Sequence, residues 1–222
     1  MNNLEILYED NHIIVVVKPI NILSQGDNTG DMDMLTLIKN YLKEKYHKPG
    51  NVYLGLVHRL DRIVGGIMVF AKTSKAASRL SNEVRMNHLN KEYLAICHGK
   101  LKEKDTFVDY LKKESDFSTI VSDSKNGKLS ELSYELIEYD SLNNLSLVKV
   151  NLKTGRHHQI RVQFASRGYP LVGDNRYGTL KEKEIGLYAY HLSFLHPVKK
   201  EIMEFTHYPK QNIFKSFKTL YK

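Results

Sequence analysis

The chain has 222 residues, of which 41% are hydrophobic and 26% charged, a composition that is ordinary for a soluble globular protein with one sizeable core or two small ones. A single cysteine, Cys97, excludes an internal disulfide and a zinc site built from several thiolates, and no apolar run is long enough to cross a membrane. The formal net charge of +8, with lysines and arginines spread along the chain, favours a basic surface that binds nucleic acid; a well-solvated surface without function is the alternative.

We expect a single catalytic domain over residues 1–222, because no repeat, low-complexity segment or linker rich in proline and glycine divides the chain. The acidic start at residues 1–5 does not have the pattern of a secretion signal, so a cytoplasmic location is expected. Cys97 lies in an apolar run, and we expect it to be a small buried hydrophobic residue.

The first predicted elements form a β-hairpin. Residues 6–8 and 13–17 are apolar and flank a turn at residues 9–11. The second run is continuous and β-branched, which is typical of a strand buried on both faces. Lys18 follows directly at the end of that strand, where a cation is expected to reach a phosphate.

The next segments read as a helix, a strand, a second helix and then a series of strands. Apolar residues at helical spacing predict helices over residues 34–46, after an N-cap at Asp33, and 74–87, after Thr73. Strand patterns occupy residues 67–71, 91–99, 107–111, 118–121, 129–139 and 145–152. The last two strands flank a polar turn and alternate apolar with polar residues, so one face of this second hairpin should be wet.

The segment from residue 152 to residue 174 is ambiguous by periodicity, since its apolar residues fit a strand and a helix equally well. Thr154-Gly155 before it, and Gly168 and Pro170 after it, favour a helix. Such a helix would present backbone N–H groups at its start and a basic face along its length, both suited to phosphates; solvated charge is the alternative.

The stretch with the most chemistry surrounds Asp61, which lies between Arg59 and Arg62. One interpretation is a surface turn in which Asp61 pairs with an arginine across solvent, an interaction worth about 0 to 1 kcal/mol. The other is that Gly65 and Gly66 let the backbone turn tightly beside a strand, so that Asp61 points into a basic cleft that attracts a polyanion. A carboxylate that is kept ionised and shielded from water can act as a nucleophile.

The residues around Asp61 also carry a resemblance. His58-Arg59-Leu60-Asp61-Arg62 resembles the HRLDR signature of the RluA-type pseudouridine synthases. Further motifs of that family stand in family order, and together they span residues 6–206, which makes chance agreement implausible. They are the N-terminal hairpin at residues 8–10 and 17–19, K-x-Y-x-A at 91–95, T-G-R-x-H-Q-I-R-V at 154–162, G-x-P-x-x-G-D at 168–174, Y-G at 177–178 and the closing segment at 191–197.

The resemblance implies an α+β fold: one pseudouridine-synthase-like domain with a mostly antiparallel mixed sheet, flanked by helices, and a central RNA-binding cleft. It implies that Asp61 is the catalytic carboxylate, Tyr93 the aromatic residue that lies against the target uracil and Arg161 the cation paired with Asp61. Core packing for Tyr93, and a phosphate contact or solvated charge for Arg161, are the alternatives. The expected RNA-binding residues are Arg59, which would fill the space left by the extruded uridine, and Arg62, Arg156, Lys18 and His158.

The implied reaction is the isomerisation of specific uridines in structured RNA, such as a stem-loop of ribosomal or transfer RNA, and it needs no cofactor and no metal. Whether Asp61 attacks C1′ or takes a 2′ proton stays open. The chain resembles short family members without a small N-terminal RNA-binding module, and we expect a monomer with no obligate protein partner. The sequence departs from the family pattern at Val64 and Gly65, where Thr-Ser is usual, at His157, where Thr or Ser is usual, and at Gln163, where His is common. The loss of hydroxyls that would brace the catalytic loop puts the rigidity of that loop in question.

Other function classes fit the sequence less well. A non-catalytic RNA-binding or assembly factor could use the same basic surface, and loss of the C5 hydrogen of uridine would distinguish it from an enzyme. A base-releasing glycosidase usually has two carboxylates around the scissile bond, but only the Asp61 motif is of that quality. A metal hydrolase is disfavoured because the ten histidines show no HExxH-type spacing.

Overall fold

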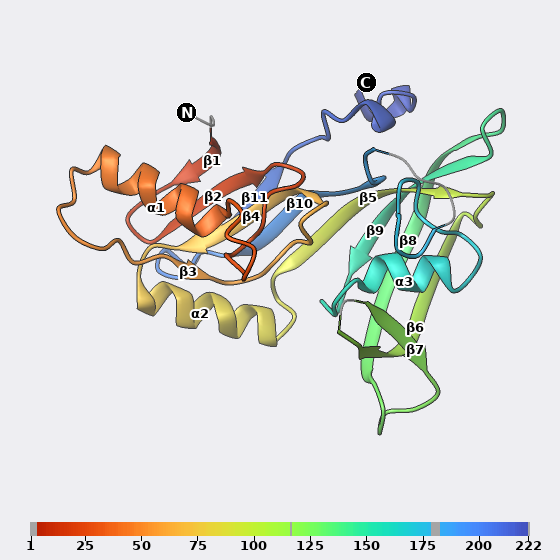
Figure 1. Ribbon diagram of the computed structural model, residues 1–222, viewed down its shortest axis with the longest axis horizontal. Helices are drawn as coiled ribbons and strands as arrows, with labels where there is room; N and C mark the ends of the chain where they lie inside the picture. Colours follow the sequence, from red (N-terminus) through yellow and green to blue (C-terminus); the bar gives the residue numbers. More distant parts are fainter. Residues whose placement is uncertain (1–3, 116, 179–182, 222) are drawn as a thin grey trace. The chain divides into compact units, whose positions relative to one another are not determined.

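The computed structural model describes residues 4–115, 117–178 and 183–221, and the chain forms two compact units. Unit 1 comprises the residues up to Leu89 together with His191–His207, and unit 2 comprises Asn90–Tyr190 together with the residues from Tyr208 onward. Each unit combines β-strands with helices (Figure 1). The predicted α+β class with a mostly antiparallel sheet is therefore confirmed, while the single-domain assignment stays a prediction.

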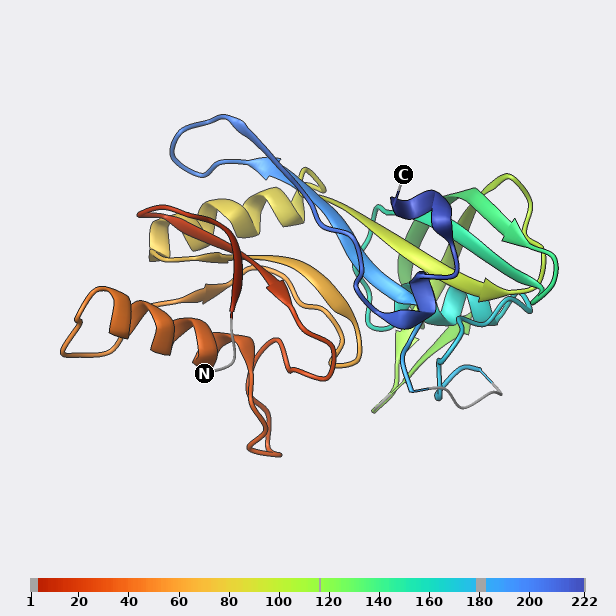
Figure 2. The ribbon, with the colours of Figure 1, turned by 90° about the horizontal axis from the view of Figure 1, so that it is seen from above.

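In unit 1 the strands hydrogen-bond in the order β1-β2-β4-β10, with β3 paired to β4 and β11 paired to β10. The pairs β1–β2, β2–β4, β3–β4 and β10–β11 are antiparallel. Helices α1 and α2 flank these strands (Figure 2). The elements are β1 (Glu5–Glu9), β2 (Ile13–Lys18), α1 (Met34–Lys45), β3 (Gly55–Leu56), β4 (Gly65–Ala71), α2 (Ser74–Arg85), the second half of β10 (Leu187–Leu195) and β11 (Ile202–Thr206).

The core of unit 1 follows from its sequence pattern. Every residue of β2 and β4 is buried, which confirms the prediction of a strand covered on both faces. Side chains of one face, such as Val15 and Val69, pack against Ala76 and Leu80 of α2. Asp33 and Thr73 cap the two helices as predicted, since each side chain accepts a hydrogen bond from the backbone N–H three residues later.

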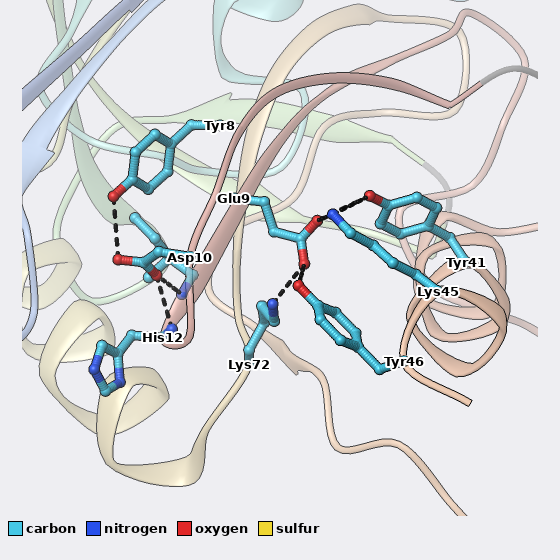
Figure 3. A network of polar contacts seen from close by, with 9 residues as sticks. Tyr8, Glu9, Asp10, His12, Tyr41, Lys45, Tyr46 and Lys72 are labelled. Carbon is cyan, nitrogen blue, oxygen red and sulfur yellow. Dashed lines mark hydrogen bonds and ion pairs between the residues drawn. The ribbon is translucent and has the colours of Figure 1, made fainter. Parts of the chain in front are cut away.

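A buried carboxylate ties three elements of unit 1 together (Figure 3). Glu9, at the end of β1, accepts hydrogen bonds from Lys45 at 2.7 Å, Lys72 at 2.6 Å, Tyr41 at 2.9 Å and Tyr46 at 2.7 Å. Its side chain is 7% exposed, and that of Lys72 is 8% exposed. Burial alone would raise the pKa of Glu9, but these hydrogen bonds outweigh burial and lower it to about 2.

We expect Glu9→Gln to destabilise the chain by about 2 kcal/mol, because it leaves Lys72 buried without its anionic partner; the half-exposed Lys45 contributes less. Because the folded-state pKa of Glu9 lies below its unfolded value, its stabilising contribution is present above about pH 4.5 and is lost as the pH falls towards about 2. Urea unfolding at pH 7 and pH 3 measures both effects. The variant should lose less stability than the wild type between these pH values; equal losses would contradict the assignment.

In unit 2 the strands hydrogen-bond in the order β10-β5-β9-β8-β6-β7, and the register pairs from β5 to β7 are antiparallel. A core cluster of Leu94 and Ile96 with Phe214 and Phe217 lies on one face of β5. The elements are β5 (Asn90–His98), β6 (Lys104–Lys113), β7 (Ser118–Val121), β8 (Lys128–Asp140), β9 (Leu145–Leu152), α3 (Gln159–Ala165), the first half of β10, and the 3-10 helices η1 (Asn212–Phe214) and η2 (Lys218–Tyr221).

The segment with ambiguous periodicity is a helix, as predicted, but only over Gln159–Ala165. The predicted basic face is wrong, because all residues from 159 to 164 are buried and Arg161 is the only cation among them. Arg156 and the two following histidines precede the helix in a turn instead. The expectation that these cations share one helical face assumed a longer helix, which would have included them.

Two further expectations can be compared with the structure. Cys97 is fully buried as predicted, and burial raises the pKa of its thiol. Within the described residues, no helix is both long and apolar enough to span a membrane.

Candidate active site

Asp61 lies in a loop of unit 1 that connects β3 to β4, which we call the Asp61 loop (residues 57–64). The backbone is held on both sides of Asp61. The Ser24 hydroxyl donates to the Leu60 carbonyl at 2.7 Å and accepts from the Leu60 N–H at 3.1 Å. The Asp61 carbonyl accepts from the N–H of Val64 at 3.0 Å. Asp61 itself is partly exposed between the buried Leu60 and the exposed Arg62, so its carboxylate is presented from a braced loop.

His58 fixes the start of the same loop to the sheet. Its Nε2 accepts a hydrogen bond from the backbone N–H of Val69 in β4 at 3.2 Å. Because Nε2 acts as an acceptor, the proton of the neutral ring is assigned to Nδ1. The first residue of the HRLDR signature, His58, therefore holds the loop in position against the sheet and does not point to solvent.

Lys18 is fully buried, and its Nζ donates to three backbone carbonyls, those of Pro19 at 2.9 Å, Ile22 at 2.6 Å and Arg62 at 3.0 Å. Three acceptors match the three hydrogens of an ammonium group. Burial lowers the pKa of Lys18 to about 7, whereas the nearby Asp61 raises it. This geometry favours Lys18 as a residue that positions the Asp61 loop, in place of the phosphate contact expected from the sequence.

The two arginines beside Asp61 are both exposed. Arg62 pairs with Asp31 at 2.7 Å, and both side chains are about half exposed, at 47% and 45%. Within the described part of the chain, the Arg59 guanidinium has no hydrogen-bond or ion-pair partner. An exposed cation of this kind is available to a polyanion without breaking an internal contact.

We expect Ser24→Ala to destabilise the chain by about 2 kcal/mol, because it leaves the N–H and carbonyl of Leu60 without their buried partner. The uridine isomerisation that the resemblance implies should also fall, since the loop that carries Asp61 loosens. Thermal unfolding and a turnover assay measure the two effects. Ser122→Ala, which alters an exposed hydroxyl, is the control, and equal behaviour of both variants would contradict the bracing role of Ser24.

Arg161 lies in α3 of unit 2 and forms a bidentate pair with Asp174, Nε to Oδ2 at 2.8 Å and Nη2 to Oδ1 at 2.7 Å. The side chains are 5% and 0% exposed. Asp174 also accepts from the backbone N–H groups of Arg176 and Tyr177. Burial alone would raise the pKa of Asp174, but the hydrogen bonds from Arg161 hold it below its usual range. The guanidinium is thus fixed in one orientation.

Tyr177 links Arg161 to the turn before α3. Its ring lies 5.2 Å from the guanidinium carbon of Arg161, and its hydroxyl lies 3.0 Å from Nδ1 of His158. Burial raises the pKa of this hydroxyl, so it stays protonated at neutral pH. The rings of His157 and His158 stack with their centroids 3.7 Å apart. Nδ1 of His157 lies 3.1 Å from the Ser118 hydroxyl oxygen.

His158 is half-buried within this group, whereas Arg156 is exposed and donates from Nε to the carbonyl of Leu129 at 3.0 Å.

Tyr93 lies in β5 and is 6% exposed. It pairs in register with Val150, which pairs with Tyr134 in turn, so the three side chains share one face of the sheet. The ring of Tyr134 contacts that of Phe164 in α3 at a centroid distance of 5.4 Å. Tyr93 therefore lies on the face of the unit 2 sheet against which the helix of Arg161 packs.

A family profile described as RNA pseudouridylate synthase matches residues 12–166. The chain belongs to the RNA pseudouridylate synthase family. The resemblance to RluA-type pseudouridine synthases is thereby confirmed, and so is the predicted enzyme class, since pseudouridine synthases are isomerases.

Two curated pseudouridine synthases show how the family match extends along the chain. The uncharacterized RNA pseudouridine synthase YhcT of Bacillus subtilis is 33% identical over 205 residues, covering 90% of this chain and 67% of that protein. Ribosomal large subunit pseudouridine synthase D of Nitrosomonas europaea is 32% identical over 213 residues, covering 90% of this chain and 60% of that protein. The chain thus spans about two thirds or less of the length of these relatives.

Among solved structures, Human RNA Pseudouridylate Synthase Domain Containing 4 superposes with a TM-score of 0.80 at 20% identity and covers 97% of this chain and 92% of that one. Human RNA Pseudouridylate Synthase Domain Containing 1 gives 0.74 at 23% identity, covering 93% of this chain and 84% of that one. At these identities the likeness shows the fold.

The residues that depart from the family pattern are buried or make side-chain contacts within the fold. Val64 is 2% exposed and Gln163 is fully buried. Gln163 donates to Asp109 at 2.6 Å, and His157 takes part in the ring stack. The Asp61 loop keeps its bracing from Ser24, because that hydroxyl is supplied from outside the motif.

Lys91 is a candidate site residue that was not expected from the sequence. Lys91 lies two residues before Tyr93 on the same face of β5, and burial lowers its pKa. A Cβ at residue 155 would lie 3.2 Å from its Nζ, so Gly155 leaves room for this ammonium before α3. Within the described residues it has no acidic partner. The lysine of K-x-Y-x-A was the available signal, but only its burial marks it as a candidate anion-binding residue.

Within unit 1 the structure brings Lys18, Asp61 and Arg62 together, and within unit 2 it connects Arg161 to His158 through Tyr177. Among the residues described, no cluster of three or more His, Cys, Asp or Glu side chains could hold a metal ion. The pairing of Asp61 with Arg161 stays a prediction.

Proposed function

We propose that this chain isomerises specific uridines of structured RNA to pseudouridine, with Asp61 as the catalytic carboxylate. The observation that carries the proposal is the Asp61 loop: a single carboxylate in an HRLDR motif, partly exposed, with its backbone fixed by Ser24 and Lys18 on either side. Catalytic side chains have to be held in place by rigid surroundings, and this loop meets that requirement.

The proposed reaction breaks the bond between N1 of uracil and C1′ of the ribose, turns the base and forms a bond from C5 to C1′. The C5 hydrogen leaves as a proton, and a proton ends on N1, so the product is an isomer. Asp61 attacks C1′ or takes the 2′ proton, and both roles use its ionised form. No electron acceptor or energy source enters this balance.

The other proposed roles follow from the residue types. Tyr93 keeps the detached uracil in place by stacking, which is worth about 1 to 3 kcal/mol per base, and its hydroxyl helps to remove the C5 proton. Arg161 supplies a fixed cation, oriented by Asp174. Arg59, Arg62, Arg156 and His158 contact the RNA and offset the few kcal/mol that extrusion of the uridine costs.

The proposed substrate is a stem-loop of ribosomal or transfer RNA. Support for ribosomal RNA comes from the relatives whose names specify the ribosomal large subunit. Lys18 positions the loop in this proposal, because its ammonium is buried and bonded to three carbonyls.

Tritium release tests the function directly. The purified chain is incubated with RNA transcribed with uridine labelled at C5, and solvent tritium is counted. Isomerisation releases the label stoichiometrically, whereas a non-catalytic RNA-binding factor releases none. Mapping pseudouridines in total RNA from cells with and without the protein then identifies the substrate. Absence of release from both ribosomal and transfer RNA would overturn the proposal.

A further inference from the structure

A cavity of about 530 Å³ lies in unit 2 beside α3, and we call it the β7–α3 cavity. Strand β7 with the residue before it, helix α3 and the segment after Asp174 form its walls. Its principal lining residues are Phe117, Ile120, Val162, Ala165, Arg176 and Tyr177. None of them has a role in the function proposed above.

The lining is apolar with a cationic rim. Phe117 is 41% exposed and Ile120 is 37% exposed, so two large apolar side chains stay accessible at this site. Arg176 is exposed, and it is the one charged residue among the described residues that line the cavity. The two aromatic lining residues, Phe117 and Tyr177, together with a cation match a nucleobase and its phosphate, the combination by which single-stranded nucleic acid is commonly bound.

The cavity shares a wall with the group that holds Arg161. Tyr177 lines the cavity, and the same ring lies over the guanidinium of Arg161. Its hydroxyl accepts from the backbone N–H of Ser118, which also lines the cavity, at 2.7 Å. An occupant of the cavity therefore contacts the residue that packs on a proposed catalytic cation.

We propose that the β7–α3 cavity binds a nucleobase of the substrate RNA other than the target uracil, with the adjoining phosphate on Arg176. The identity of the partner as RNA rests on the proposed function. The hydroxyls of Ser118 and Ser166 already donate to backbone carbonyls, at 2.7 Å and 3.0 Å. With those two donors engaged, stacking is expected to dominate the binding of a base, and stacking tolerates different bases.

The test compares two fluorescein-labelled RNA dodecamers, oligo(U) and a matched oligomer with abasic positions, by anisotropy. Ala165→Phe fills the cavity, and Ile120→Ser removes apolar surface without altering α3. Each variant should weaken oligo(U) binding about tenfold and leave the abasic oligomer unchanged, because stacking contributes roughly that factor per base. Leu142→Phe, in an exposed turn of the same unit, is the control and should bind both oligomers as the wild type does.

Unchanged oligo(U) binding by both variants would overturn the inference, and so would an equal loss for both oligomers. The first result is also expected if an apolar side chain of a protein partner occupies the cavity. Tritium release by the wild type is measured on the same preparation. If the wild type releases no tritium, the proposed function is refuted. The comparison of the two oligomers tests independently whether the cavity binds a nucleobase.

Discussion

Asp61→Asn is expected to lower uridine isomerisation about 1,000-fold or more and to leave RNA affinity within about twofold. Asparagine keeps the shape of the side chain but has neither a nucleophilic oxygen nor a basic one, and positioned acid–base chemistry alone contributes about 10² to 10⁴-fold. The backbone contacts of the loop do not involve the carboxylate, so the fold should persist. Tritium release gives the turnover, and filter binding with the same RNA gives the affinity.

The control for this variant is Asp27→Asn, which removes an exposed carboxylate of the same unit. It should retain wild-type turnover. Turnover by Asp61→Asn within about tenfold of the wild type would remove Asp61 from the mechanism. A loss of turnover accompanied by lost RNA binding would instead assign Asp61 to binding.

Asp174→Asn is expected to destabilise the chain by about 3 kcal/mol, the largest stability effect that we predict for a single substitution. It removes the buried carboxylate that forms the bidentate pair with the Arg161 guanidinium, and removal of one member of a buried pair costs about 3 to 5 kcal/mol. Urea unfolding measures this cost. Glu135→Gln, which breaks an exposed pair with Lys149, should cost at most about 1 kcal/mol.

The same variant separates positioning from folding. At a temperature where Asp174→Asn is fully folded, kcat should fall about tenfold or more while the Kd for RNA changes little, because Arg161 is present but no longer oriented. A variant that is destabilised but has the wild-type kcat would restrict Asp174 to a structural role. Unchanged stability would contradict the buried ion pair itself.

Individual strands and helices were predictable because they depend on residues that are close together in the sequence. A continuous β-branched run marked β2 as buried, and Asp33 and Thr73 marked the starts of two helices. The ends of α3 were harder to predict. The backbone of His158 is left-handed, at φ 54°, and its ring stacks on that of His157, so the helix begins only at Gln159. The periodicity of the sequence does not reveal this starting point.

The sequence by itself determined the family and the candidate site residues: the motifs around Asp61, Tyr93 and Arg161 are contiguous strings, and all three lie within the residues that match the family profile. Only the tertiary structure decided how these residues are held. Ser24 meets Leu60 across 36 positions, Lys18 meets the Arg62 carbonyl across 44, and Asp174 turns back onto Arg161. Such contacts depend on burial and on strand pairing between distant segments, because a buried polar group has to find a partner wherever the fold supplies one.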